Sequence, residues 1–147
     1  EKDLIERHNN ELANKLGNLV LRVSTLIEKN GLEKSKIKNL ASEEVQKKTA
    51  KYFENLEFDK VLNEIFAFID KCNEFIQEKK PWETKDKKVL YELVNAIKDF
   101  TILLSPFMPS TCEKIAKTFG FEIDFKELKK ELKISKIKKS EILFKKV

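Results

Sequence analysis

Apolar residues recur along this chain at the spacing of helices and not in the alternation of half-buried strands. The first such stretch covers residues 3–29, and its clearest stripe consists of Leu12, Leu16, Leu19, Val23 and Leu26. Steps of four and three keep these side chains on one face of a helix. Gly31 follows the stretch, and a glycine there suits the left-handed residue that ends many helices. The pattern therefore predicts one long helix over residues 3–29.

Four more stretches show the same periodicity and predict helices over residues 42–55, 58–79, 86–104 and 109–119. Ser42 is a candidate N-cap of the second helix, and Ser110-Thr111-Cys112-Glu113 matches a capping box at the start of the fifth. Gly120 is a stop signal after the fifth helix. The stripe of the third helix is the broadest, which indicates a central helix that touches several neighbours.

Turn residues are scarce, because the chain of 147 residues contains 3 Gly and 3 Pro. Folds with many corners need such residues, so their scarcity favours a few long helices. The expected fold is all-α: a helical bundle of about five helices over residues 1–120, followed by a short basic C-terminal extension over 121–147. That extension combines a short helical pattern near 125–132 with a β-prone end at 142–144. Short connections make consecutive helices antiparallel, so the first and third should be parallel and finish at the same end of the bundle.

The charge of the chain is mildly positive and unevenly placed. Thirty Lys and Arg face 25 Asp and Glu, which gives a formal net charge of +5. Residues 126–147 contain nine Lys and three Glu. A basic segment can attract a polyanion, but a solvated, lysine-rich face explains the same composition. Charge alone leaves both interpretations open.

The sequence offers no arrangement typical of catalysis or metal binding. His8 is the only histidine, and Cys72 and Cys112 do not form a metal-ligand spacing. Phosphate-binding glycine loops are absent. The two cysteines are expected to be structural thiols in a reducing compartment. The chain also has no secretory signal and no apolar run of membrane length, so we expect a cytoplasmic protein without catalytic residues, metal site, cofactor or membrane contact in this stretch.

Three segments carry a family resemblance: Glu11–Arg22 (ELANKLGNLVLR), Asn73–Ile76 followed by Pro81-Trp82, and Leu103–Pro109 (LLSPFMP). In this order they resemble the anticodon-binding domain of methionyl-tRNA synthetases, which are class I aminoacyl-tRNA synthetases. The third segment alone is shared with leucyl, valyl and isoleucyl enzymes, whereas the combination with the first two favours the methionyl branch. Leu21 departs from the family, which often has a polar residue at this position, and we do not expect the departure to affect the site.

The resemblance implies a tRNA partner that is bound through its anticodon stem-loop, with the anticodon CAU of methionine tRNAs. The family's anticodon-binding residues fall on Asn18, Arg22 and Trp82, with Pro81 directly before the tryptophan. The resemblance also implies a parent ATP-dependent methionine–tRNA ligase, whose catalytic domain binds ATP and lies outside this chain. The extension over 121–147 would then pack on the bundle or on that catalytic domain.

The chemistry of these side chains suits an unpaired RNA loop, whose bases can be splayed out, stacked and hydrogen-bonded at their edges. Asn18 and Arg22 are four residues apart and therefore lie on the same face of the first helix. An Asn amide both donates and accepts hydrogen bonds, and an Arg guanidinium donates several. Trp82 follows the third helix directly, so parallel first and third helices would bring it near Arg22.

Two other interpretations of the sequence remain. The chain could be the corresponding domain of a leucyl-type or related class I synthetase, in which Asn18 and Arg22 are ordinary surface residues. It could also belong to a different class of protein, a helical protein–protein docking module, which would display an exposed apolar patch.

Overall fold

The computed structural model describes residues 2–130, with the side chains of 2–14 and 129 excepted. Within this range the helices are α1 (Lys2–Asn30), α2 (Glu43–Glu54), α3 (Phe58–Lys79), α4 (Pro81–Thr84), α5 (Lys87–Leu104) and α6 (Pro109–Phe119), with a 3-10 helix, η1 (Phe125–Lys129). No strand occurs among these residues, and the prediction of an all-α bundle is confirmed. The one-turn helix α4 lies where the sequence predicted a connection. The predicted β-prone end at 142–144 lies outside the described residues.

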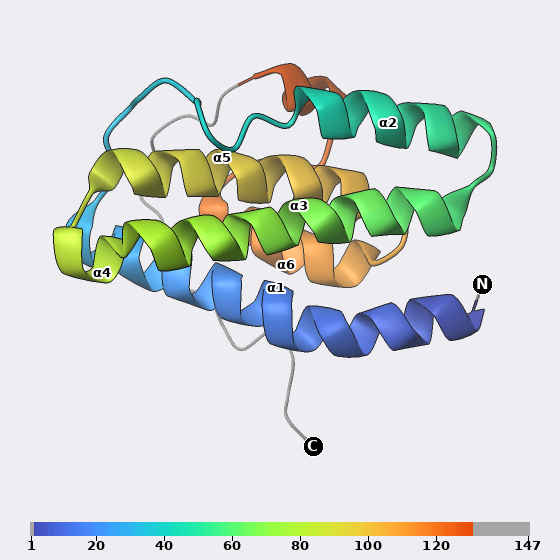
Figure 1. Cartoon of the computed structure of the whole chain (residues 1–147), viewed down its shortest axis with the longest axis horizontal. Coiled ribbons are helices and arrows are strands. Elements are labelled where there is room, and N and C mark those ends of the chain that lie inside the picture. The colour runs from blue at the N-terminus through green and yellow to red at the C-terminus, as the bar shows by residue number, and fades with distance from the viewer. Residues whose placement is uncertain (1, 131–147) are drawn as a thin grey trace.

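The long helices are arranged side by side, and their directions follow the expected antiparallel order (Figure 1). α1 and α3 run in the same direction, while α2 and α5 run in the opposite one. The C-terminal ends of α1 and α3 therefore lie at the same end of the bundle, and α4 lies there too. This arrangement confirms the predicted topology and places the candidate residues of α1 beside those of α4.

The core is built around α5. Every residue of this helix from Val89 to Leu104 is buried except Asp99, whereas α3 buries only one side. α5 contacts α1, α3, α4, α6 and η1, and α3 contacts α1, α2 and α5. The prediction that α3 touches several neighbours is confirmed, but α5 is the more central helix. The hydrophobic pattern did not predict the central position of α5, because four of its buried residues are polar or charged: Glu92, Asn95, Lys98 and Thr101.

Glu92 holds the connection between α1 and α2 onto the bundle. Its Oε1 atom accepts hydrogen bonds from the backbone N–H groups of Lys38, Asn39 and Leu40, at 2.9, 2.7 and 3.2 Å. The side-chain amide of Asn39 donates to Oε2 at 3.1 Å. A buried carboxylate with this many donors is well compensated for its lost hydration. The connection is therefore anchored by a single side chain from α5.

Lys98 holds η1 in a similar way from the same helix. Its side chain is 2% exposed, and its ammonium group pairs with Asp99 at 2.9 Å and donates to the carbonyl oxygens of Glu127 and Lys130. Two carbonyl acceptors and one carboxylate thus surround the buried ammonium group. Burial raises the pKa of Asp99, while the hydrogen bonds from Ser42 and Lys98 act in the opposite direction.

The helix ends agree only in part with the sequence signals. Gly31 and Gly120 follow α1 and α6 with positive φ angles of 82° and 73°, as predicted. Ser42 is the N-cap residue of α2, but its hydroxyl makes no cap hydrogen bond and donates to Asp99 instead. The predicted capping box at Ser110 is wrong, because α6 begins at Pro109 with Met108 as its N-cap residue. Proline fits the first helical position, since its φ is already helical and its missing N–H has no partner to lose there.

Both cysteines are packed in the core. Cys72 on α3 and Cys112 on α6 are each fully buried, and both are free thiols. Burial raises the pKa of Cys112 to about 12 and raises that of Cys72 further above its ordinary value. Neither forms a reactive thiolate at neutral pH. The prediction of structural thiols is confirmed.

Replacing Glu92 with Ala should lower the free energy of unfolding by about 3–5 kcal/mol, because it leaves buried backbone donors without an acceptor. The measurement is urea denaturation followed by circular dichroism. Glu78→Ala, at an exposed position of α3, is the control and should change stability by less than about 0.5 kcal/mol. Equal effects of the two substitutions would contradict the anchoring role of Glu92.

Candidate nucleic-acid interface

α4 is held in a fixed position between α3 and α5. Pro81 occupies its first position and is buried. Lys80 and Lys85 flank the turn with left-handed φ angles of 46° and 58°. Such angles cost a non-glycine residue about 1 kcal/mol or more, so the surrounding packing must hold them. The backbone turns sharply on both sides of Trp82, which is left 37% exposed.

Trp82 and Arg22 form a stacked pair across the junction of α4 and α1. The guanidinium carbon of Arg22 lies 4.8 Å from the centre of the indole ring. This is the distance of a cation–π interaction. The structure therefore brings together the two residues that the parallel arrangement of α1 and α3 was predicted to bring together.

Asn18 lies one helical turn before Arg22 on α1 and is exposed. Four residues correspond to about 6 Å along a helix axis, so its amide is within reach of a ligand that also contacts Arg22. Pro81, in contrast, is buried and shapes the turn that presents Trp82. Three of the four predicted site residues are thus at the surface, and the fourth supports one of them.

A hollow of about 360 Å³ opens beside this pair and is lined by Leu21, Arg22, Thr25, Leu26 and Trp82. Sequence reasoning missed the contribution of Leu21, Thr25 and Leu26. Leu21, which departs from the family pattern, is one of these residues and lines the hollow next to Trp82. The position of Leu21 directly before Arg22 in the sequence indicated that it could lie near the site. Its contribution to the hollow depends on the placement of α4 against α1, which the sequence pattern does not show.

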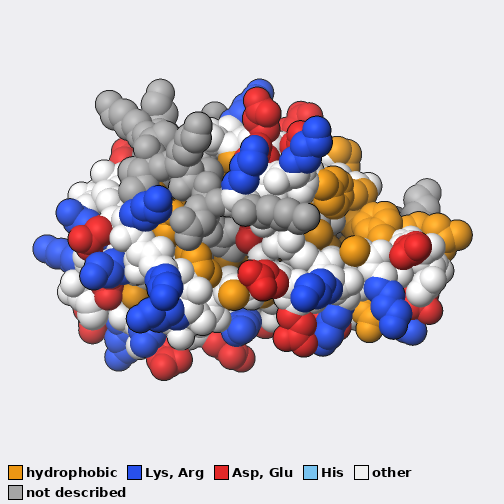
Figure 2. All heavy atoms as spheres, turned by 90° about the horizontal axis from the view of Figure 1, so that it is seen from above, with side chains coloured by type: hydrophobic (Ala, Val, Ile, Leu, Met, Phe, Trp, Pro, Cys, Tyr) orange, Lys and Arg blue, Asp and Glu red, His pale blue; other side chains and the backbone are white. Residues whose placement is uncertain are grey.

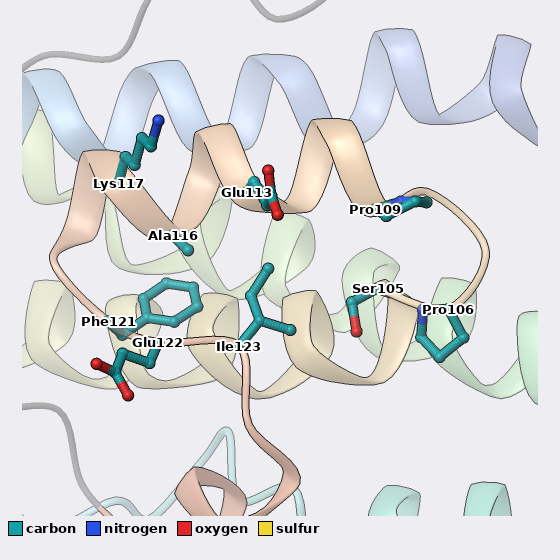
Figure 3. A pocket seen from close by; sticks show the side chains of 9 residues that line it. All are labelled: Ser105, Pro106, Pro109, Glu113, Ala116, Lys117, Phe121, Glu122 and Ile123. Atoms are coloured by element: carbon teal, nitrogen blue, oxygen red, sulfur yellow. The ribbon is translucent and has the colours of Figure 1, made fainter.

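The other large hollows contain none of the predicted site residues. Figure 3 shows one of about 580 Å³ between the end of α5, α6 and the segment 121–123. Its lining combines apolar residues with Glu113, Lys117 and Glu122. Two carboxylates against one ammonium group do not suit a polyanion. Among the described residues, no group of three or more His, Cys, Asp or Glu could hold a metal ion.

An apolar patch lies at the opposite end of the bundle, around the turn between α2 and α3. Leu56 is 71% exposed there, and the rings of Phe53, Phe58 and Phe107 pack on one another with centres 5.6–6.2 Å apart. In the view of Figure 2, hydrophobic side chains gather at one end of the molecule, while basic and acidic side chains alternate among the other coloured residues. This is the kind of surface that a docking module would need.

Comparison with known families identifies the domain. The family model for the anticodon-binding domain of tRNA ligase matches residues 41–145, which is well over half of the chain. The chain belongs to this family. The match includes Pro81 and Trp82, and the curated relatives extend it over α1. None of the helices within residues 2–130 is long and apolar enough to cross a membrane.

Curated relatives of this anticodon-binding domain include methionine–tRNA ligases. That of Borrelia hermsii is 36% identical over 156 residues, which span 97% of this chain and 21% of the relative. That of Caldanaerobacter subterraneus is 34% identical and aligns over 96% of this chain and 26% of the relative. The expected resemblance to the methionyl-tRNA synthetases is confirmed. The chain spans about a fifth to a quarter of the length of these relatives.

The fold is shared with a solved structure as well. The methionyl-tRNA synthetase of Mycobacterium tuberculosis bound by methionyl-adenylate superposes with a TM-score of 0.86, at 18% identity, over 99% of this chain and 34% of that one. At this level of identity the similarity concerns the fold. It shows that the bundle described above is the architecture of this domain in a distant relative.

The pairing of Arg22 and Trp82 can be measured without a ligand. In a double-mutant cycle of Arg22→Ala and Trp82→Ala, we expect a coupling of about 0.5–1 kcal/mol in the free energy of unfolding, as for exposed cation–π pairs. Urea denaturation followed by circular dichroism suits all four proteins, because it does not depend on the tryptophan. Additive effects of the two substitutions would show that the stacked pair does not form in solution.

Proposed function

We propose that this domain binds the anticodon loop of a methionine tRNA and reads its CAU anticodon, so that a methionine–tRNA ligase can position the tRNA. The observation that carries this proposal is the Arg22–Trp82 pair next to the exposed Asn18 on α1. In this pair the guanidinium carbon lies 4.8 Å from the centre of the indole ring. The relatives, which are methionine–tRNA ligases, support the choice of tRNA. Activation of methionine with ATP belongs to the catalytic part of such a ligase.

Each of the three side chains has a different role in the proposed recognition. The indole of Trp82 is a platform on which an unpaired base can stack, an interaction worth roughly 1–3 kcal/mol. The amide of Asn18 pairs with a base edge, because it presents a donor and an acceptor side by side. The guanidinium of Arg22 donates to a base edge or to a phosphate, and its contact with the ring keeps it at the site before RNA arrives.

The fold gives this arrangement rigidity. Asn18 and Arg22 belong to a helix that is packed on α3 and α5, and Trp82 is carried by a turn anchored through the buried Pro81. Side chains on helices keep their geometry better than side chains on loops. A base that leaves the loop stack therefore meets groups that are already in place.

A fluorescence titration tests the proposal directly, since Trp82 is the only tryptophan. We expect a synthetic anticodon stem-loop with CAU to change the emission of Trp82 at a lower concentration than a matched stem-loop with a different anticodon. Both titrations need the same salt concentration, because phosphate contacts make RNA affinity strongly salt-dependent. Equal responses to the two RNAs would rule out anticodon reading and favour the leucyl-type alternative.

Replacing Trp82 with Ala should weaken binding of the CAU stem-loop by roughly 1–3 kcal/mol, because the stacking platform is lost. The stability of the protein should change by no more than about 1 kcal/mol, since the indole is partly exposed. Binding is measured by the anisotropy of a labelled RNA and stability by circular dichroism. Trp82→Phe should retain part of the affinity. A Trp82→Ala protein that binds normally, or one that unfolds, would contradict the assigned role.

The exposed Leu56 and its aromatic neighbours support a second candidate function, contact with the rest of a longer ligase. This surface lies at the opposite end of the bundle from Trp82, so the two functions do not compete. Apolar contacts depend weakly on salt, whereas RNA binding weakens steeply as salt rises. Leu56→Asn should therefore leave the affinity for the stem-loop unchanged.

A further inference from the structure

Three lysines of the connection between α1 and α2 lie on its outer side. Lys34, Lys36 and Lys38 are exposed, whereas Ser35 and Ile37 between them are half-buried. Exposure at every second residue is the pattern of a chain that runs along a surface and turns alternate side chains inward and outward. The side chain of Ile37 lines a hollow beside α5. The segment 34–38, the basic connection, therefore presents three charges side by side to the solvent.

The basic connection is attached to α5 near both of its ends. Oε1 of Glu92 accepts hydrogen bonds from the backbone N–H groups of Lys38 and of the two residues after it, at 2.7–3.2 Å. On the other side, the N–H of Glu33 donates to the carbonyl oxygen of Lys87 at 3.4 Å. Figure 1 shows the connection passing along α5 on its way to α2. The three lysines therefore have a defined place on the bundle although they belong to no helix.

The start of α5 extends this surface and makes it clearly cationic. Lys87 and Lys88 are exposed there. Together with the basic connection they make five lysines, and the acidic residues of segments 33–38 and 86–88 are Glu33 and Asp86. Residues 1–130 as a whole contain 24 basic and 23 acidic residues, so the excess of positive charge is local. The carboxylate of Asp86 is moreover bonded to backbone N–H groups as the N-cap of α5.

The charges of these five lysines are not offset by ion pairs. Among the side chains that the structure describes, no carboxylate pairs with any of the five. In other parts of the chain, Lys15, Lys48, Lys60 and Lys130 each pair with a carboxylate at 3.0–3.5 Å. A carboxylate at this distance cancels much of the field that an ammonium group presents to a ligand. The five lysines therefore retain their attraction for an anion.

This surface borders the end of the bundle at which Arg22 and Trp82 are paired. Lys87 lies five residues after Trp82, and the helix α4, which carries the tryptophan, contacts α5. The basic connection follows the last turn of α1, the helix of Arg22. An RNA strand carries a phosphate at every nucleotide, so cations beside a site that binds its bases meet further phosphates. Lysines bind these as point charges and do not distinguish one base from another.

We propose that the basic connection binds phosphates of the anticodon stem-loop and that Glu92 is the residue that positions it. The inference rests on the proposed function and adds a second surface to it. Base preference stays with the residues around Trp82, whereas the lysines add the same affinity for every base sequence. The family resemblance does not imply this contact, because its motif segments end at residue 22 and resume at residue 73.

The test uses the salt dependence of binding, which reports how many phosphates a protein neutralises. The double variant Lys36→Gln, Lys38→Gln is compared with Lys51→Gln, Lys114→Gln, whose exposed lysines lie on α2 and α6 outside this surface. Affinities for two labelled stem-loops, one with CAU and one with a changed anticodon, are measured by anisotropy at several salt concentrations. The first variant should weaken binding of both RNAs by the same factor and reduce the slope of log K against log salt by about 0.7–0.9 per lysine. The control variant should leave the slope unchanged.

Glu92→Ala tests the positioning role in the same titrations, at a temperature at which circular dichroism shows the variant to be folded. It should reduce the slope as the lysine variant does, and the two changes combined should reduce it no further, because they remove the same contact. Glu92→Gln keeps an acceptor for the backbone N–H groups and should restore most of the slope. If Glu92→Ala does not fold, Glu92→Asp takes its place, because its shorter side chain cannot reach all of these donors.

An unchanged slope in the lysine variant, or an equal reduction in the control variant, would overturn the inference while the proposed function stands. A changed ratio of the affinities for the two stem-loops would also overturn it, because the lysines would then distinguish bases. An unchanged slope in the Glu92 variant would show that this residue only stabilises the fold and would overturn its positioning role. Failure of the unmodified protein to bind the CAU stem-loop would instead refute the proposed function.

Discussion

Burial of α5 around its whole circumference is the constraint on which the rest of this bundle depends. A helix that is covered on all sides needs partners for its polar residues as well as for its apolar ones. Glu92 and Lys98 meet this requirement by forming hydrogen bonds to backbone groups of two segments outside the α-helices. These segments are residues 38–40 and η1 with the residue that follows it. Each charged residue therefore fixes a piece of irregular chain onto the bundle. The same bonds that compensate the buried charges also define the path of the connections.

The position of the site follows from this packing. α1 and α3 both lie against α5 and run in the same direction, so their last turns meet at one end of the bundle. α4 begins immediately after α3 and places Trp82 over Arg22. A rigid scaffold thus carries a partly exposed aromatic ring and a guanidinium without using a flexible loop. Lys80 and Lys85, on the two sides of α4, adopt left-handed backbone angles, and packing elsewhere in the fold offsets the conformational cost of these angles.

Much of the architecture could be predicted from the sequence, because helical periodicity, glycine stops and proline breaks are local properties. The all-α class, the long first helix, the ends at Gly31 and Gly120 and the parallel course of α1 and α3 follow from such signals. The family resemblance pointed to Asn18, Arg22 and Trp82. The capping box at Ser110 was a local signal that a stronger one, the proline at the start of α6, overrode.

Tertiary structure alone decided which helix lies at the centre and what surrounds the site. A buried Glu92 or Lys98 looks like a surface residue in a sequence, because its partners are backbone groups far along the chain. The hollow next to Trp82 combines Leu21, Thr25 and Leu26 from α1 with a ring from α4, about 60 residues later. The periodicity and the motifs of the chain were enough to predict the helices, the candidate chemistry and the family. Contacts between distant segments determined the burial of charge and the shape of the surface, because neither is encoded in the spacing of neighbouring residues.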